Sequence, residues 1–211
     1  SFCFVMTSNR PFAAILAIAG LGQMLVVQQG GFDLSVPGRV SLAVVIASHV
    51  PAGNDAALPY AILLAFGCAT AAGIGNGILV GYFRLNAIIA TIGMNALLYG
   101  GVFAVSGGVP MITTKLLARI ADGQMLGVAN AVYFAIAITI VVTLVMKKTV
   151  AGRRFEAIGA NPAAAHAIGL PTRFYEMMAY VLAQLHYCVT GIRIAGSTTQ
   201  PQTRQQPGTS L

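Results

Sequence analysis

Residues able to perform acid–base, nucleophilic or metal chemistry are few and widely separated in this chain. The histidines and cysteines occur at no metal-ligand spacing, and no Ser–His–Asp or paired-carboxylate arrangement is present. No segment resembles the Gly-x-x-x-x-Gly-Lys-Ser/Thr loop that binds nucleotide phosphates. We therefore expect a protein that is not an enzyme and that holds no metal and no cofactor.

Three ionisable residues lie in or beside apolar runs, where a charge is costly and often functional. Asp33 could gate or line a translocation path, but we favour a helix N-cap, with Arg39 as its ion-pair partner; Ser35 could also supply the cap. His186 and Arg193 lie on nearly one helix face and could form a proton or substrate site. For Arg193 we favour a side chain that extends to the membrane interface from the end of its helix.

Uncharged amide and hydroxyl side chains also interrupt the apolar runs. They could exchange hydrogen bonds with a hydroxyl-rich ligand, or they could join one helix to another within a membrane bundle. Both interpretations stay open for each residue. The candidates for a translocation path are Asp33, Gln23, Asn76, Thr91 and Asn95.

The composition determines the class of protein that must position these side chains. Of the 211 residues, 57% are hydrophobic and only 8% are charged, whereas soluble domains carry roughly a quarter charged residues. The chain is therefore predicted to be a polytopic membrane protein. Its net charge of +7 then reports membrane topology and is no indication of nucleic-acid binding.

Six apolar segments predict a single all-α transmembrane bundle over residues 1–211. A polar lead, Ser1–Arg10, precedes them, and a polar tail over residues 197–211 follows them. Gly30–Ser35 contains a Gly-Gly helix breaker, and Ser106–Gly127 is a loop with room for a short interfacial helix. The predicted spans are Pro11–Gln28, Leu34–Val50, Tyr60–Val80, Leu85–Val105, Val128–Met146 and Met177–Ala195.

A partly polar segment, Lys147–Glu176, separates the last two spans. Placing it in the cytoplasm leaves two cations, Lys115 and Arg119, in the outside loops. Because cytoplasmic loops of membrane proteins are enriched in Lys and Arg, this orientation is the favoured one. Composition alone makes the segment an ordinary cytoplasmic loop. The six cations on its side are Arg84, Lys147, Lys148, Arg153, Arg154 and Arg173.

Four stretches, in this order and spacing, resemble the permease subunits of bacterial ABC importers for sugars of the ribose, xylose and galactose type. The first is similar to that family's Gly-Gly-Ile-Asp-Leu-Ser-Val segment, the second to Gly-x-x-Asn-Gly, and the third to Phe-Ile-x-Thr-Leu-Gly. The fourth is similar to its cytoplasmic loop, Gly-Arg-x-x-x-Ala-x-Gly-x-Asn-x-x-Ala-Ala. The stretches are Gly30–Val36, Gly73–Val80, Ile88–Gly93 and Gly152–Gly169.

The chain departs from this family at several points. Pro37 stands where the family has glycine, and Arg193 stands where it is apolar. The resemblance fades after Ala195, and the family's first and last helices have no counterpart. We therefore expect a copy that is truncated at both ends.

The resemblance implies an ATP-driven importer in which this chain carries a monosaccharide across the inner membrane by alternating access. It implies four partners: an ATP-binding subunit, a second permease copy, a periplasmic sugar-binding protein and the lipid bilayer. A short helix that starts at Asn161–Pro162 and ends at Gly169 would couple the chain to the ATPase. The implied coupling residues are Gly152, Arg153, Arg154, Glu156, Gly159, Asn161, Pro162, Ala164, Ala165 and Gly169.

Two alternatives come from other classes of protein. A self-sufficient secondary carrier would need intramembrane ionisable residues for ion coupling, for which Asp33, His186 and Arg193 are the candidates. A truncated remnant would transport nothing, and the missing helices favour it. Stable accumulation in the membrane and dependence on ATP or on a proton gradient separate the three hypotheses.

Overall fold

A computed structural model of the chain describes residues 2–125 and 128–197. The regular structure of the described residues is helical, apart from two paired strands of two residues each, β1 (Gln124–Met125) and β2 (Val128–Ala129). This confirms the all-α expectation. The predicted polar tail lies outside the described residues beyond Ser197. The helices are α1 (Phe2–Gln28), α2 (Val36–His49), α3 (Leu58–Gly77), α4 (Ala87–Ser106), α5 (Lys115–Asp122), α6 (Asn130–Lys148), α7 (Val150–Ala160), α8 (Pro162–Ala167) and α9 (Thr172–Ser197).

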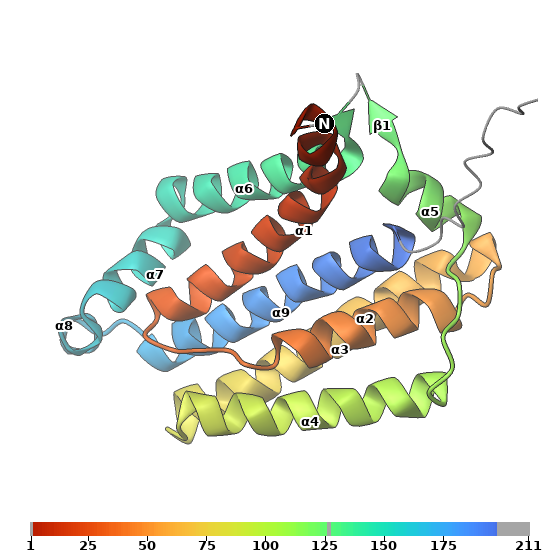
Figure 1. The fold of residues 1–211 in the computed structure, drawn as a ribbon. Helices are drawn as coiled ribbons and strands as arrows, with labels where there is room; N and C mark the ends of the chain where they lie inside the picture. The colour runs from red at the N-terminus through yellow and green to blue at the C-terminus, as the bar shows by residue number, and fades with distance from the viewer. Residues whose placement is uncertain (1, 126–127, 198–211) are drawn as a thin grey trace, which may run out of the picture.

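Helix α9 lies in the centre of the bundle and packs against α1, α2 and α3 (Figure 1). Glycines permit this close packing, because a Cβ atom placed on Gly73 of α3 would lie 2.6 Å from the Cα atom of Val181. Further along α9, a Cβ on Gly191 would lie 2.5 Å from the carbonyl oxygen of Val40 in α2. The Gly73–Gly77 stretch is thus a helix-packing surface, as its small residues predict.

Two helices flank this core on opposite sides. Helix α4 packs mainly on α2, and α6 packs mainly on α1, so both present wide apolar faces outward (Figure 1). By length and composition, three helical segments could cross a membrane: Asp55–Tyr82, Ala87–Ser106 and Asn130–Lys148. Helix α2 and the described apolar part of α1 are shorter, and α9 is long but more polar.

The six predicted spans all form helices, with differences at their boundaries. The prediction that a polar lead precedes the first helix was wrong, because α1 already begins at Phe2 and includes these residues. The apolar run from Phe2 to Met6 contains no glycine or proline, so nothing in it stops the helix from extending. Before α3 lies a short 3₁₀ turn, Asp55–Ala57, and after it a π-helical turn, Ile78–Tyr82.

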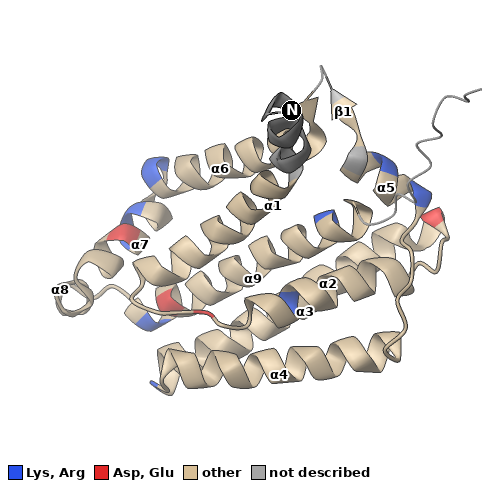
Figure 2. Ribbon diagram, viewed as in Figure 1, with Lys and Arg blue, Asp and Glu red and all other residues tan. Residues whose placement is uncertain are grey.

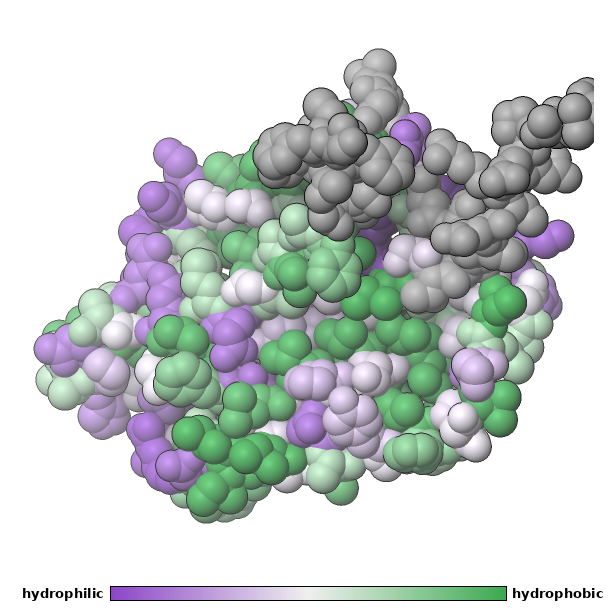
Figure 3. Space-filling model, viewed as in Figure 1, coloured by the Kyte–Doolittle hydropathy of each residue, from purple (hydrophilic) through white to green (hydrophobic). Residues whose placement is uncertain are grey.

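Charge is concentrated at the two ends of the bundle. The six cations that we expect on the cytoplasmic side lie together at the end formed by α7, the last turn of α6, the first turn of α9 and the connection before α4 (Figure 2). Lys115 and Arg119 lie at the opposite end, on α5. Between the ends the visible surface is largely apolar (Figure 3). After the orientation that the sequence predicts, we call these two ends the cytoplasmic and periplasmic ends below.

Candidate functional site

Helix α2 begins inside the bundle and not at its surface. After α1 ends at Gln28, the chain turns at Gly30, whose φ of +76° suits glycine, and runs back along the bundle as an extended segment to Ser35 (Figure 1). The 14 residues of α2 then span about 21 Å, less than the roughly 30 Å hydrocarbon core. Irregular backbone at such depth is tolerated only where protein surrounds it or where it lines a cavity.

Side chains of the neighbouring α4 satisfy this irregular backbone. The Leu34 amide donates to the Thr91 hydroxyl at 3.0 Å, and the Gly38 amide donates to the Asn95 side-chain oxygen at 2.8 Å. Thr91 and Asn95 lie one turn apart on α4, so one face of that helix accepts from both groups. The first turn of α2 is therefore capped by another helix.

Asp33 and Ser35 form the centre of a buried polar cluster. The Asp33 carboxylate accepts from the Ser35 amide at 2.9 Å and from the Gln184 side-chain amide at 2.9 Å. The Ser35 hydroxyl accepts from Gln184 at 2.6 Å and from Asn76 at 3.3 Å. These side chains and that of Thr91 are almost fully shielded from solvent. We call the connection Gln29–Ser35 the α1–α2 break. Polar groups from α3, α4 and α9 thus enclose it.

The structure brings four of the five path candidates together at this break, namely Asp33, Asn76, Thr91 and Asn95. Gln23 lies elsewhere, on α1, where it accepts a hydrogen bond of 2.7 Å from the Tyr187 hydroxyl. For Gln23, Asn76, Thr91 and Asn95 we kept hydrogen bonds within the bundle as the alternative, and each of the four bonds another segment. Whether these residues also line a path stays a prediction.

The expected N-cap role of Asp33 was wrong. The N-cap position of α2 is held by Ser35, whose side chain makes no capping hydrogen bond. In the described part of the chain Asp33 forms no ion pair with Arg39. The Arg39 guanidinium is fully buried and donates to the Ala65 carbonyl oxygen at 2.9 Å and to the Cys188 sulfur at 3.6 Å. The reason is geometric, since Asp33 lies in the extended segment and Arg39 points from α2 toward α3 and α9.

Arg193 is buried against α5 and joins that helix to α9, and its expected place at the membrane interface stays a prediction. Its side chain is only 6% exposed and donates to the carbonyl oxygens of Ile120 and Ala121, at 3.2 and 3.1 Å. It also lies 5.0 Å from the centre of the Phe134 ring. His186 bonds a carbonyl of its own helix, that of Leu182. Among the described residues no group of histidine, cysteine and acidic side chains could hold a metal ion.

The predicted coupling segment, Lys147–Glu176, contains two helices at the cytoplasmic end, α7 and α8. The side chain of Thr149 accepts from the Gly152 amide at the start of α7, and Asn161 accepts from the Ala164 amide at the start of α8. Pro162 occupies the first turn of α8, and Gly169 follows that helix with φ +82°. The predicted start and end of α8 are confirmed, whereas α7 was not expected as a separate helix.

Most of the implied coupling residues are exposed. Gly152 and Ala165 are buried and Gly159 is half-buried. Phe155 and Ile158 anchor α7 in the bundle. The sequence interpretation missed Ile168, which follows α8 and is 77% exposed; its neighbours Ala167 and Leu170 are also apolar, so the sequence gives no clear signal of its exposure. The exposed members are Arg153, Arg154, Glu156, Asn161, Pro162, Ala164 and Gly169.

Helix α7 also contacts the end of α1 directly. Gly159 packs against the Gln28 carbonyl oxygen so closely that a Cβ atom there would collide with it. The Gln29 side-chain amide donates to the Phe155 carbonyl oxygen at 2.9 Å. The exposed coupling segment is therefore joined to the end of α1 and to the first residue of the α1–α2 break.

Comparison with known proteins assigns this architecture to a family. A model for the permease component of branched-chain amino acid transport systems matches residues 11–197. The chain belongs to this permease family. Relatives named as sugar permeases confirm the expected resemblance to ABC sugar permeases. No solved structure matches the chain.

Three relatives of this permease illustrate the likeness. The galactofuranose transporter permease protein of Escherichia coli (strain K12) is 32% identical over 87% of this chain and 54% of its own length. A probable ABC transporter permease protein of Sinorhizobium fredii is 34% identical over 85% and 54%. The L-arabinose ABC transporter permease protein of Azospirillum brasilense is 30% identical over 89% and 56%. The chain spans about half the length of these relatives.

Proposed function

We propose that this chain is a permease subunit of an ATP-driven importer that carries a monosaccharide across the bacterial inner membrane by alternating access. Two of its relatives are named for galactofuranose and L-arabinose, which supports a sugar as the substrate. In this proposal the chain works with a separate ATP-binding subunit, a second permease copy and a periplasmic sugar-binding protein. The three long apolar helices support its place in the bilayer.

One observation carries the proposal: the exposed tip formed by α8 and Ile168 at the cationic end of the bundle. A large exposed apolar side chain with charged neighbours suits insertion into a groove on a partner, with the charges at the rim of the contact. Ile168 is the apolar anchor, and Arg153, Arg154 and Glu156 on α7 supply the rim. The partner that the proposal requires at this tip is the ATPase.

The contacts of α7 suggest how motion of that partner reaches the membrane helices. Phe155 and Gly159 contact Gln29 and Gln28, which lie directly before the Gly-Gly turn. Hinges are commonly a few residues between elements that absorb a change in backbone angles. A shift of α7 would therefore act on the α1–α2 break and on the buried start of α2.

Co-purification from the native host tests the proposal. The tagged full chain is extracted in mild detergent, and an ATP-binding subunit is expected to accompany it. Ile168→Asp, and separately the reversal of charge at Arg153, Arg154 and Glu156, are expected to remove that subunit. Ile112→Asp is the matched control, since Ile112 is 67% exposed in the loop at the opposite end.

A stable chain that brings no ATPase, or that keeps it in both coupling variants, would overturn the proposal. Uptake driven by a proton gradient alone would then favour a secondary carrier. Failure of the unmodified chain to accumulate in the membrane would favour a remnant without transport activity.

A further inference from the structure

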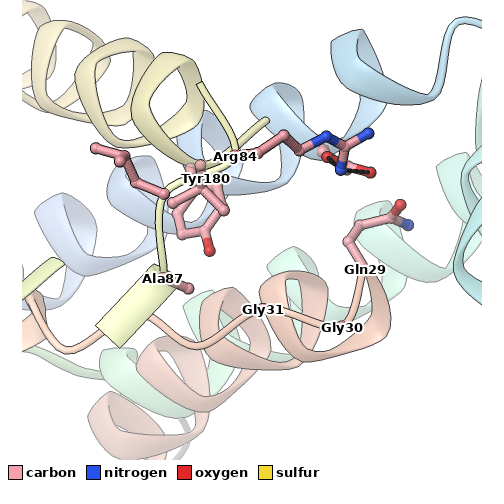
Figure 4. A pocket seen from close by; sticks show the side chains of 9 residues that line it. Gln29, Gly30, Gly31, Arg84, Ala87 and Tyr180 are labelled. Atoms are coloured by element: carbon pink, nitrogen blue, oxygen red, sulfur yellow. Dashed lines mark hydrogen bonds and ion pairs between the residues drawn. The ribbon is translucent and has the colours of Figure 1, made fainter. Parts of the chain in front are cut away.

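A pocket of about 280 Å³ opens at the cytoplasmic end of the bundle, beside the α1–α2 break (Figure 4). Gln29, Gly30 and Gly31 form one wall. Tyr180 of α9 and the connection between α3 and α4 form the others. The volume is near the lower end for small-molecule sites, so a compact ligand the size of one sugar ring suits it.

Two buried polar atoms at this pocket have no hydrogen-bond partner within the described residues. The first is the hydroxyl of Tyr180, a residue only 2% exposed, and the second is the side-chain oxygen of Gln29. Buried tyrosine hydroxyls usually find a partner, and each exception calls for an explanation. Figure 4 shows the Tyr180 hydroxyl pointing toward the turn at Gly30 and Gly31.

Gly31 creates the room for that hydroxyl. A Cβ atom on Gly31 would lie 2.5 Å from the Tyr180 oxygen, so any other residue would displace one or the other. The tyrosine hydroxyl can donate and accept, and the Gln29 oxygen can accept. A ligand hydroxyl, which does both, complements this pair.

An ion pair lies at the rim of the pocket. Arg84 donates to the Glu176 carboxylate at 3.1 Å and is 58% exposed. Arg84 adopts a left-handed backbone conformation with φ +56°, which is uncommon outside glycine and recurs at functional sites. Because the two charges neutralise each other, the pocket favours a neutral ligand over an anion.

We propose that this pocket is a binding site for a neutral monosaccharide, with Tyr180 and Gln29 as its direct hydrogen-bonding partners. The choice of a sugar as the ligand rests on the proposed function. The Gln29 side chain also donates to the Phe155 carbonyl oxygen in α7. One side chain therefore touches both the ligand and the coupling segment, so the occupancy of the pocket and the position of α7 depend on each other.

Saturation-transfer NMR on the purified full chain tests the site, with D-galactose, L-arabinose, D-ribose and D-xylose as the probes. We expect at least one of these sugars to bind. Tyr180→Phe keeps the ring and removes only the hydroxyl, so its affinity should fall about fivefold, as for the loss of one hydrogen bond. Gly31→Ala should abolish binding by occupying the space of that hydroxyl. Tyr60→Phe, at a position 64% exposed at the start of α3, is the matched control and should bind as the unmodified chain does.

Co-purification of the ATPase from the same preparations separates this inference from the proposed function. If the ATPase is present but no sugar binds, the pocket assignment is overturned and the importer proposal stands. Equal affinity in Tyr180→Phe and in the unmodified chain also overturns it, because a purely structural tyrosine would give that result. If Tyr180→Phe fails to fold, Gly31→Ala decides in its place, and unchanged binding there overturns the assignment.

Discussion

Helices α2 and α8 both follow a non-helical connection to the preceding helix, but the backbone amides at their starts find acceptors in different ways. The start of α2 lies inside the bundle, where Thr91 on α4 accepts from Leu34 just before the helix and Asn95 accepts from Gly38 in its first turn. The first turn of α8 lies at the surface and uses its own N-cap, Asn161. A change at the start of α2 must therefore disturb several helices, whereas a change at the start of α8 is confined to the cytoplasmic face.

This difference matches the roles that we propose for the two places. The coupling helix α8 forms from local signals, so it can present Ile168 to a partner without support from the membrane helices. The start of α2 depends on α3, α4 and α9 together, so it registers any movement among them. A break of this kind suits a protein that must alternate between two arrangements of its helices.

The largest loss of stability is expected for Gln184→Met. This change removes the amide that donates to both the Asp33 carboxylate and the Ser35 hydroxyl. Asp33 would keep its bonds from Ser35 but lose the donor to its second buried oxygen, and this should lower the free energy of unfolding by about 3 kcal/mol. Thermal unfolding in detergent measures the loss. Gln23→Met is the control, since Gln23 makes one hydrogen bond at a half-buried position. An equal loss of stability in that variant would contradict the claim that the polar cluster at the α1–α2 break contributes more than an ordinary hydrogen bond between helices.

Thr91→Val is expected to cost about 1–2 kcal/mol, because the partly buried Leu34 amide would lose its acceptor. Valine keeps the shape of threonine, so packing is nearly unchanged. Thr139→Val on α6 is the matched control, because that hydroxyl bonds only the Ala135 carbonyl of its own helix. Equal unfolding temperatures for the two variants would show that α2 does not depend on α4 for its first turn.

Arg193→Met tests whether a side chain of α9 also satisfies the last turn of α5. Without the guanidinium, the carbonyl oxygens of Ile120 and Ala121 lose the donors that tie α5 to α9. We expect a loss of about 1–2 kcal/mol and faster proteolytic cleavage near α5. Unchanged cleavage would mean that α5 is held by its apolar contacts alone.

Asn161→Ala should have the smallest effect on overall stability. Loss of an exposed N-cap costs about 1 kcal/mol of local helix stability, and the unfolding temperature of the bundle should stay the same. Recovery of the ATPase should nevertheless fall, because α8 presents the proposed contact. A lower unfolding temperature would contradict the local character of this cap.

Several features of the fold could be predicted from the sequence because local chemistry determines them. The apolar runs predicted the long helices, the Gly-Gly pair predicted the α1–α2 break, and Asn161–Pro162 with Gly169 predicted the limits of α8. Residues that act on distant segments escaped prediction. Nothing beside Gln184 in the sequence indicates that it reaches Asp33, 151 positions away.

The same distinction explains the errors. A favoured N-cap role for Asp33 rested on local pattern, but the carboxylate is drawn into a cluster built by α3, α4 and α9. The contacts of Arg193 were missed because its partners, the last carbonyls of α5, lie 72 or more positions away. Ile168 lies between apolar neighbours, Ala167 and Leu170, and only the fold shows that it is exposed.

Site-specific photo-crosslinking tests the central claim most directly. A photoreactive amino acid replaces Ile168 in the full chain, and the native-host membranes are irradiated without extraction. We predict a crosslink to an ATP-binding subunit from position 168 and none from the control position, Ile112. A crosslink from position 112, or no crosslink to such a subunit from position 168 in a chain that accumulates normally, would contradict the claim that the tip beside α8 receives the ATPase.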